Sequence, residues 1–369
     1  MIPVARPELP PLERYVELLR DVWQSHMLSN FGRYARLFES RAQAYLGTPR
    51  VRAVASGDLG LVLGLAALDL PAGGEVILPS FTFNSTVNAV LWNRLTPVFA
   101  DIEPERLTLD PGEVARLAGP RTACVLATHV FGNPCDDAAI RDALGGRPVP
   151  VVYDAAHAFG TLYRGRHAGA LGDVEAFSFS GTKLVTSGEG GLVTAARDEI
   201  VTRLEYLRAY GFQDDYESHV VGLNAKLSEL HAALGALNVE TTEHAVRRRG
   251  AIADRYRRAL GAIPGLAFQH VDGRDRSTWK DFAILCPHGR AALERRLGDA
   301  SIQTKRYFRP AHTMRAYRSW SSRPLPRTDL AYERILCLPI FNEMTDAQVD
   351  TVAAEIAAFY RGAPPAAGA

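Results

Sequence analysis

The stretch from Val149 to Gly191 constrains the fold of this 369-residue chain more than any other part of it. It begins with the apolar residues Val149, Val151 and Val152, and this run ends on a carboxylate, Asp154. A short apolar run closed by a turn is typical of a strand buried inside a parallel sheet. Ligands of open α/β sheets bind at the carboxyl ends of strands, so we expect this carboxylate at the ligand-binding edge.

A second apolar run in the same stretch, residues 174–179, leads to Ser-Gly-Thr-Lys ending at Lys183, and a Gly-rich turn follows at 187–191. A carboxylate and a lysine at two strand ends suit pyridoxal phosphate, which needs a lysine for covalent attachment and an acidic partner for its pyridine nitrogen. Each residue also has an ordinary explanation. A strand-end aspartate such as Asp154 can cap a helix, and Ser-Gly-Thr-Lys can form a solvated turn.

Strand and helix patterns alternate on the amino-terminal side of this stretch. They predict helices at 12–27, 33–46, 59–68 and 84–92, and strands at 51–55, 75–78, 97–100 and 123–128. Repeated βα units predict a mostly parallel sheet with helices on both faces.

The rest of the chain predicts a second, smaller unit. Residues 227–260 have one long helical pattern, and the composition changes from Gly261 onward. Beyond it we expect strands at 279–286 and 336–338, and helices at 291–297 and 346–360. The predicted organisation is a helical segment (1–48), a large cofactor-binding α/β domain (49–245), a small α+β domain (246–361) and a frayed tail (362–369).

Composition excludes several classes of function. A net charge of +1 gives no electrostatic reason to expect nucleic acid or an anionic membrane as a partner. The four cysteines are far apart in sequence, so we expect free thiols in a reducing cytosol and no zinc. The amino terminus has no signal-peptide pattern, and the apolar run 59–70 is too short to span a bilayer. We therefore expect a soluble cytoplasmic protein.

The spaced motifs resemble those of the DegT/DnrJ/EryC1/StrS family of sugar aminotransferases, with D-x-A-(Q/H)-x-x-G, then G-D, S-F-x-x-x-K and G-E-G-G in this order. Here they are Asp154-Ala155-Ala156-His157, Gly160, Gly172-Asp173, Ser178-Phe179, Lys183 and Gly188 to Gly191. The resemblance covers nearly the whole chain. It implies an aspartate-aminotransferase-like fold (fold type I), usually a homodimer with active sites at the interface.

The resemblance implies a role for each matching residue. Asp154 would keep the pyridine nitrogen protonated, His157 would contact the ring's 3-oxygen, and Ser178 would bind the phosphate. Lys183 would hold the cofactor and then move the proton between substrate and cofactor carbons, with pyridoxamine phosphate as the amino-carrying form. Related sugar dehydratases have histidine in place of Lys183, so the lysine favours transamination.

The phosphate would also contact the start of a helix at Ser56-Gly57-Asp58-Leu59, where exposed amides and the helix dipole attract anions. The family has Ser-Gly-Thr there, so Asp58 replaces a threonine whose hydroxyl binds phosphate. A carboxylate facing a phosphate is unfavourable. We therefore expect the amides of Asp58 and Leu59 to bind it, although Asp58 could also simply cap the helix.

Three further segments match family motifs. In Pro79-Ser80-Phe81-Thr82-Phe83 the second aromatic, Phe83, would stack on the cofactor ring, although core packing would explain it as well. In Gly222–Glu229, Asn224 would reach the partner's cofactor phosphate, and Lys226 stands where arginine is common at the substrate site. His312, in a segment resembling one that lines the sugar-nucleotide site, is assigned to substrate.

These patterns favour an aminotransferase that moves an amino group from an amino acid, by family habit L-glutamate, to a nucleotide-linked keto sugar. Overall resemblance suggests dTDP-4-keto-6-deoxy-D-glucose, aminated at C4, in deoxyamino-sugar or antibiotic biosynthesis. Amination at C3, or of a cyclitol ketone, stays open. The rival from another class is a non-catalytic sensor or scaffold that kept the fold, which Asp58 favours and which Asp154, Ser178 and Lys183 oppose.

Overall fold

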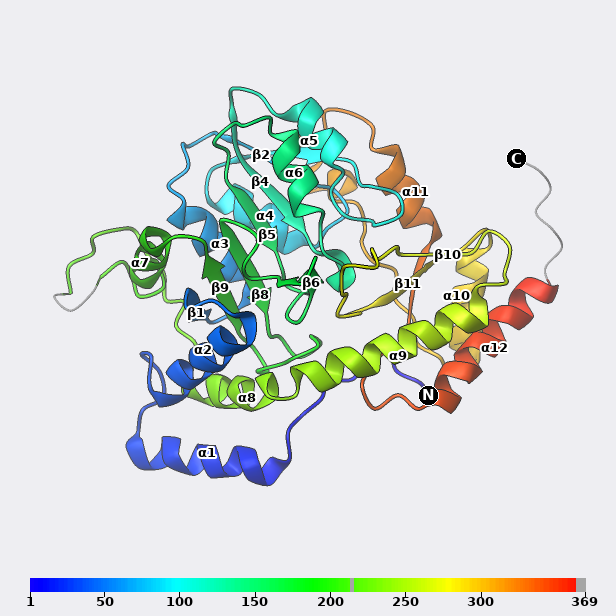
Figure 1. The fold of residues 1–369 in the computed structure, drawn as a ribbon, viewed down its shortest axis with the longest axis horizontal. Helices are drawn as coiled ribbons and strands as arrows, with labels where there is room; N and C mark the ends of the chain where they lie inside the picture. Colours follow the sequence, from blue (N-terminus) through cyan, green and yellow to red (C-terminus); the bar gives the residue numbers. More distant parts are fainter. Residues whose placement is uncertain (213–215, 363–369) are drawn as a thin grey trace.

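The computed structural model describes residues 1–212 and 216–362. In this part of the chain the largest sheet has seven strands in the order β1-β9-β8-β5-β4-β2-β3 (Figure 1). Neighbours from β3 to β8 pair in parallel, and β9 runs antiparallel to both β8 and β1. The predicted mostly parallel sheet is confirmed. Its strands are β1 (Val51–Val54), β2 (Glu75–Pro79), β3 (Thr96–Ala100), β4 (Thr122–Thr128), β5 (Val151–Asp154), β8 (Val174–Ser178) and β9 (Gly191–Ala195).

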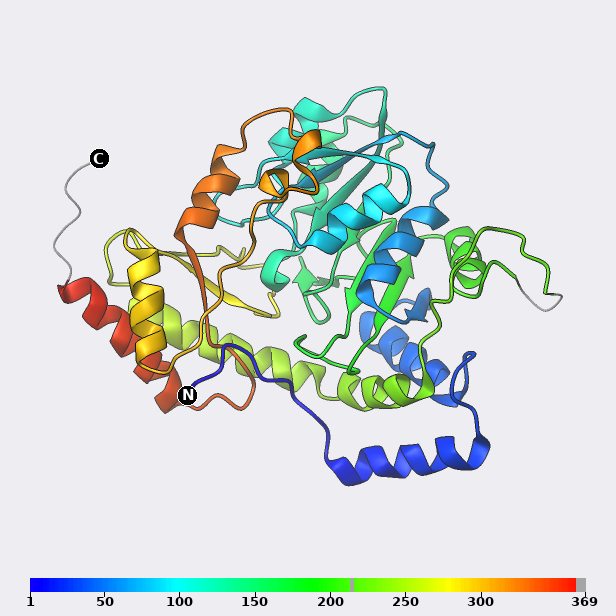
Figure 2. The ribbon, with the colours of Figure 1, turned by 180° about the vertical axis from the view of Figure 1, so that it is seen from behind.

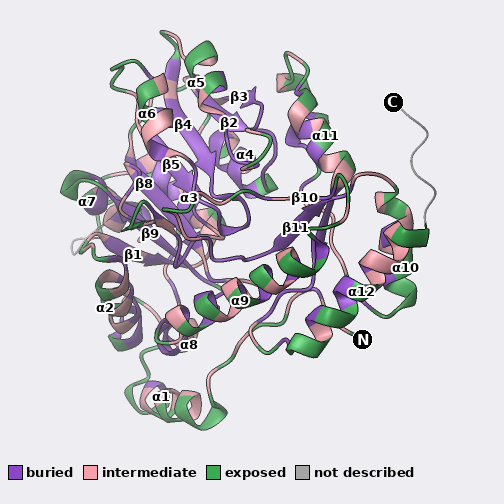
Figure 3. Cartoon of the chain, turned by 45° about the vertical axis from the view of Figure 1, so that its right-hand side comes forward, coloured by how far each residue is buried: buried purple, intermediate pink, exposed green. Residues whose placement is uncertain are grey.

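Helices cover both faces of this sheet, which explains why its strands are apolar throughout. Side chains alternate along β8, so Ala176 packs in the core on one face and Phe177 in the core on the other. Figure 2 shows α3 and α4 in front of the first face, and Figure 3 shows the strands almost wholly buried. The first core includes residues of α3 (Gly57–Ala67), α4 (Asn84–Trp92) and α7 (Asp198–Leu207), and the second includes residues of α2 (Arg33–Leu46), α5 (Pro111–Leu117), α6 (Asp137–Ala143) and α8 (Glu229–Val239).

A smaller unit is built on an antiparallel sheet in the order β10-β11-β12. Its strands are β10 (Ala267–Phe268), β11 (Phe282–Leu285) and β12 (Ile335–Leu338), and it packs with α9 (Thr242–Leu260), α10 (Arg290–Asp299) and α12 (Asp346–Gly362) in a separate core.

The prediction of one helix over 227–260 is wrong, because α8 ends at Val239 and α9 begins at Thr242. Two consecutive threonines interrupt it. Their hydroxyls donate to the carbonyls of Asn238 (3.0 Å) and Val239 (2.8 Å), which competes with regular helical bonding.

Two segments cross between the units. The first residues of the chain lie on the small unit, where Ile2 bridges Ile302 and the amide of Ile340 donates to the carbonyl of Val4 (3.1 Å). Ala311 belongs to the large unit's core, on the α3 face of the sheet. The remaining elements are α1 (Leu12–Ser25), η1 (Val130–Gly132), β6 (Leu162–Tyr163), β7 (Arg166–His167), η2 (Ala311–Thr313), η3 (Arg318–Trp320) and α11 (Pro326–Arg334).

Of the tail predicted to be frayed, Gly362 ends α12, and residues 363–369 lie outside the described part of the chain. Within the described residues, no helix combines the length and the apolar character needed to cross a membrane.

Candidate active site

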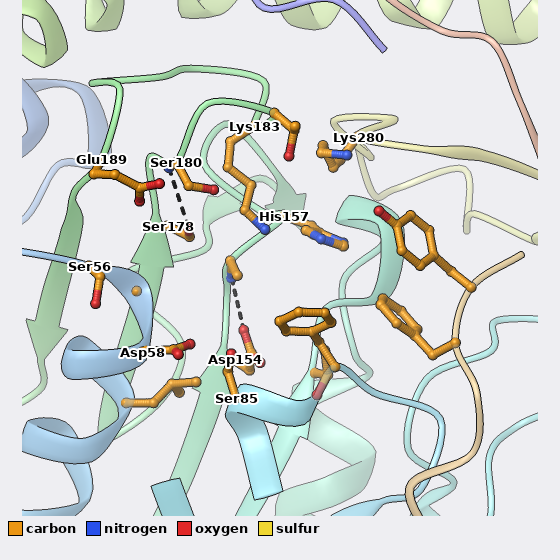
Figure 4. A pocket seen from close by; sticks show the side chains of 18 residues that line it. Ser56, Asp58, Ser85, Asp154, His157, Ser178, Ser180, Lys183, Glu189 and Lys280 are labelled. Carbon is orange, nitrogen blue, oxygen red and sulfur yellow. Dashed lines mark hydrogen bonds between the residues drawn. The ribbon is translucent and has the colours of Figure 1, made fainter. Parts of the chain in front are cut away.

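The carboxyl ends of β1, β5 and β8 meet at one edge of the sheet, together with the start of β9. A cavity of about 280 Å³ opens there (Figure 4). Its walls carry Ser56 and Gly57 from the start of α3, Asp154 from β5, and Ser178 and Lys183 from the end of β8 and the turn after it. Two strand ends therefore bring together the carboxylate and the lysine that the sequence predicted.

Asp154 is 3% exposed, and its carboxylate is held by one hydroxyl group and one backbone amide. One carboxylate oxygen accepts from Thr86 Oγ1 (2.6 Å) and the other from the Ala156 amide (3.1 Å). Since Thr86 donates its proton to the carboxylate, it must accept from Thr82 (2.6 Å), which in turn accepts from Thr128 (2.9 Å). Burial raises the pKa of Asp154, whereas the bonds from Thr86 and Ala156 favour the ionised form. A positively charged N–H in the cavity would stabilise that form further.

His157 presents a proton donor to the cavity. Its Nδ1 accepts a hydrogen bond from the Phe131 amide (3.3 Å). Burial, with smaller contributions from Lys183 and Lys280, holds the pKa of His157 well below its usual value, so the ring is neutral. A neutral imidazole that accepts at Nδ1 carries its proton on Nε2, which can donate to an oxyanion.

Lys183 points into the cavity between Ser178 and His157 (Figure 4). Burial, and then repulsion from Lys280, lower the pKa of Lys183 to about 8, against the opposing effect of Asp154. A lysine titrating near neutral pH can act both as a nucleophile and as a base.

The start of α3 provides an anion-binding end. Ser56 caps the helix, because its Oγ accepts from the Leu59 amide (3.2 Å). The expectation that Asp58 caps the helix is therefore wrong, and the Leu59 amide predicted for phosphate is already used. The amides of Gly57 and Asp58 remain at the helix start for an anion.

Glycine is required where α3 approaches β8. A Cβ on Gly57 would lie 2.7 Å from the Ser178 Cβ, which real contacts do not reach. The absence of a side chain at Gly57 therefore brings the helix start and the Ser178 hydroxyl to one place, as predicted for a phosphate site.

Two exposed carboxylates, Asp58 and Glu189, also line the cavity. Among the described lining residues the cations are Lys183 and Lys280. Figure 4 shows Asp58 and Glu189 on the same side of Lys183 as Ser56, which is the anion-binding end. The carboxylate of Asp58 therefore opposes an anion in this single chain.

Phe83 is 54% exposed although it is a large apolar residue. It lines the cavity, and its ring lies 6.4 Å from that of Phe308. An exposed aromatic face in a cavity is suited to stacking on a planar ligand, whereas the neighbouring Phe81 is fully buried in the core.

Besides Leu59, three predicted site residues lie outside this cavity. Asn224 is exposed, and the ammonium of Lys226 lies over the ring of Tyr210 (4.1 Å to the centroid). His312 is 9% exposed, and its Nδ1 is hydrogen-bonded to Ser80 Oγ (2.7 Å). His312 is therefore not part of the cavity wall. Its ring instead holds the segment after Pro310 against Ser80, the residue that follows β2.

Sequence reasoning missed several residues of the site. The chain of hydroxyls that holds Asp154 begins at Thr82 in the Phe-Thr-Phe motif, but its links to Thr128 and to Asp154 itself depend on tertiary contacts. Lys280 and Tyr307 line the cavity from the small unit. Lys280 carried no motif recognised in the sequence. Tyr307 begins the segment that resembles a sugar-nucleotide site, but only His312 of that segment was assigned a role. The one available signal was a lysine next to an aspartate at the start of a predicted strand.

The buried carboxylate, the low-pKa lysine, the Nε2 donor and the anion-binding helix start match the needs of pyridoxal phosphate. Residues of this chain therefore fit the cofactor, and the fold and site define a class: a pyridoxal-phosphate-dependent enzyme with the aspartate-aminotransferase-like fold. The family is more specific. Residues 12–357 match the model of the DegT/DnrJ/EryC1/StrS aminotransferase family, so the chain belongs to this family of pyridoxal-phosphate-dependent sugar aminotransferases.

Similar proteins agree with this assignment. A GDP-perosamine synthase of Vibrio cholerae is 32% identical over 95% of this chain and 97% of its own length. A dTDP-4-amino-4,6-dideoxy-D-glucose transaminase of Escherichia coli is 29% identical, over 94% of this chain and 95% of its own. A crystal structure of DesI in the presence of its TDP-sugar product superposes with a TM-score of 0.91 at 33% identity, covering 98% of this chain and 93% of that one.

Proposed function

We propose that this aminotransferase moves an amino group from an amino acid, L-glutamate first among candidates, to a keto sugar carried on a nucleotide. The particular substrate proposed is dTDP-4-keto-6-deoxy-D-glucose, aminated at C4. The proposed reaction rests chiefly on Lys183, because its lowered pKa and its position beside Asp154 suit the active site of a transaminase. The nucleotide sugar is supported by the names of relatives, which refer to GDP- and dTDP-linked amino sugars.

When bound, pyridoxal phosphate supplies a carbonyl carbon that exchanges nitrogen with amines and a ring that withdraws electrons from the neighbouring carbon. Asp154 would pair with the pyridine N–H, and His157 Nε2 would donate to the 3-oxygen. The amides of Gly57 and Asp58 and the Ser178 hydroxyl would bind the phosphate. Lys183, once free as an amine, would take the proton from the substrate carbon and return it to the cofactor carbon on the other side of the transferred nitrogen.

We further propose that the enzyme works as a homodimer. Asn224 lies on an exposed segment with Val221 (97% exposed), Leu223 and Tyr216, so polar and apolar side chains are presented together. A second copy would bury the apolar side chains. It would also place Asn224 beside the partner's cofactor phosphate, and the positive charge of Lys226, two residues further on, would offset Asp58 and Glu189.

The first test is the absorption spectrum of purified enzyme before and after L-glutamate. If L-glutamate removes the yellow colour of the lysine-bound cofactor in the wild type, and Lys183→Ala shows no such change under the same treatment, the cofactor has taken up the amine. The amine-loaded enzyme is then given keto sugars on dTDP or GDP, a 3-keto isomer, and a cyclitol ketone. We expect the colour to return with dTDP-4-keto-6-deoxy-D-glucose and mass spectrometry to show its 4-amino product. Bound cofactor with no transfer to any nucleotide keto sugar would contradict the proposal.

A further inference from the structure

Lys280 is a lysine in the cavity wall that the mechanism above does not use. It is 3% exposed and comes from the small unit, two residues before the start of β11. Figure 4 shows Lys280 on the side of Lys183 away from Ser56 and Ser178. The cavity therefore has a second cation at the end opposite its anion-binding helix.

The main chain fixes Lys280 relative to the cofactor site. Its amide donates to the Phe131 carbonyl (2.9 Å), and the Phe131 amide donates to His157 Nδ1 (3.3 Å). Its carbonyl accepts from Nη1 of the fully buried Arg249 (3.0 Å). Because Phe131 bonds to both Lys280 and His157, this lysine is held beside the ring that would contact the cofactor.

The charge of Lys280 is only partly matched by the protein. Its Nζ lies 3.1 and 3.2 Å from the two carboxylate oxygens of Asp281, its sole hydrogen-bond partner within the described chain. An ammonium has three N–H groups, so at least one is left for a ligand. Burying an ammonium is costly unless it is paired, and its position in a cavity wall therefore points to an anionic ligand.

Tyr307 supplies a second donor to the same cavity. Lys305 Nζ donates to its hydroxyl oxygen (3.1 Å), so the phenolic proton is free to be donated elsewhere. Burial raises the pKa of Tyr307, which keeps that proton in place at neutral pH. An ammonium N–H and a phenolic O–H can together bind the two oxygens of one carboxylate.

The geometry points to a role for these groups in donor recognition: we propose that Lys280, with Tyr307, binds the α-carboxylate of the amino-acid donor. The inference rests on the proposed aminotransferase function. In an α-amino acid the carboxylate is attached to the carbon that bears the reacting nitrogen, so it must lie close to Lys183. The diphosphate of a nucleotide sugar is attached to the anomeric carbon, across the sugar ring from C4, and would lie farther away.

The test compares L-glutamate with 4-aminobutyrate, which lacks the α-carboxylate, in single-turnover loss of the lysine-bound cofactor colour. We expect Lys280→Met to raise the apparent Kd for L-glutamate by about 10- to 100-fold, as for a lost charge-assisted hydrogen bond. The value for 4-aminobutyrate should change less than about threefold, and Lys280→Arg should restore most of the L-glutamate affinity. The apparent Kd for dTDP-4-keto-6-deoxy-D-glucose, measured on amine-loaded enzyme, should stay within the same limit.

A second variant and a binding measurement complete the test. The single variant leaves the Asp281 carboxylate buried without its partner, which can destabilise the protein. The double variant Lys280→Met with Asp281→Asn removes both charges, and the affinities for L-glutamate and 4-aminobutyrate are compared in it in the same way. Titration with 2-methyl-L-glutamate, which cannot lose an α-proton, reports carboxylate binding without turnover. Equal losses for both amines would make Lys280 merely structural, and a loss confined to the nucleotide sugar would assign it to the diphosphate; either result overturns the proposal. If the wild-type enzyme binds this analogue but transfers no amine, the proposed aminotransferase function is contradicted and the carboxylate-binding role of Lys280 is not.

Discussion

At the residue scale, the pKa of Lys183 predicts how the enzyme acquires its cofactor. Covalent attachment needs the neutral amine, and burial together with Lys280 lowers its pKa to about 8. Below that pH the neutral fraction falls about tenfold per pH unit. The attachment rate of pyridoxal phosphate to cofactor-free enzyme, followed by stopped-flow absorbance, should therefore rise with pH and level off above about 8.

The same measurement on Lys280→Met tests the cause. Removing a neighbouring positive charge stabilises the protonated amine, so the pKa of Lys183 rises and the rate profile moves to higher pH. A wild-type rate that still rises about tenfold per pH unit at pH 9 would show that the pKa of Lys183 is not lowered to this value.

Replacing Asp58 should strengthen cofactor binding and weaken the stability of the cofactor-free protein. Its carboxylate lines the anion-binding end and repels a phosphate, so Asp58→Asn and Asp58→Thr should lower the Kd for pyridoxal phosphate by about three- to tenfold. A carboxylate in the first turn of α3 also favours the helix dipole, so the cofactor-free variants should lose about 0.5 kcal/mol of stability. Fluorescence titration and urea unfolding measure the two quantities. Weaker cofactor binding in Asp58→Asn would contradict this prediction. It would mean that the carboxylate helps to bind the phosphate by accepting a hydrogen bond from a group that contacts it.

The residues of the site differ in whether a local sequence pattern identifies them. Asp154 and Lys183 were predicted from their positions at strand ends, and His157 and Ser178 from the family motifs within the same stretch. The structure brings all four to the cavity. Lys280 lies about a hundred positions away in the sequence, and its approach to the site depends on how the small unit docks. No local pattern encodes that contact.

At the element scale, the contact between α3 and β8 is expected to tolerate no side chain at Gly57. Alanine there would place its Cβ 2.7 Å from the Ser178 Cβ, so the helix start must move away from the phosphate site. We expect Gly57→Ala to lose about 1–3 kcal/mol of stability and most of its cofactor affinity. Gly250→Ala in α9 is the matched control, because nothing lies within 4 Å of its Cβ, and it should gain up to about 1 kcal/mol. Equal urea unfolding midpoints for the two variants would refute the close approach.

Elements were predicted well where periodicity alone decides them, and less well where side chains compete with the backbone. The apolar runs gave β5 and β8 because both faces of the sheet are buried. The break between α8 and α9 was missed because it depends on hydroxyls of Thr241 and Thr242 bonding back to carbonyls. Helical periodicity continues on both sides and conceals the break.

At the scale of the whole molecule, the proposed homodimer would complete the anion-binding end of the cavity. The anion-binding end has carboxylates at Asp58 and Glu189, while the predicted phosphate ligand Asn224 is exposed outside the cavity. Large apolar side chains at Trp23 and Leu28 are more than half exposed as well. Isolated exposed apolar residues are ordinary, but their occurrence together with uncompensated carboxylates at the anion-binding end supports the proposed second copy.

Mixed dimers decide whether Asn224 acts in the site of its own chain or of its partner. Lys183→Ala and Asn224→Asp should each be inactive alone, the first without its base and the second with a carboxylate against the phosphate. If Asn224 acts across the interface, a mixed dimer has one site with both lesions and one with neither. Random re-association of equal amounts should then recover about a quarter of wild-type activity per chain. If Asn224 acts within its own chain, each site carries one lesion and no activity returns. Size-exclusion chromatography with light scattering confirms that the chains are paired, and purification through a different affinity tag on each variant isolates the mixed dimers. Absence of activity in these mixed dimers would exclude the shared site.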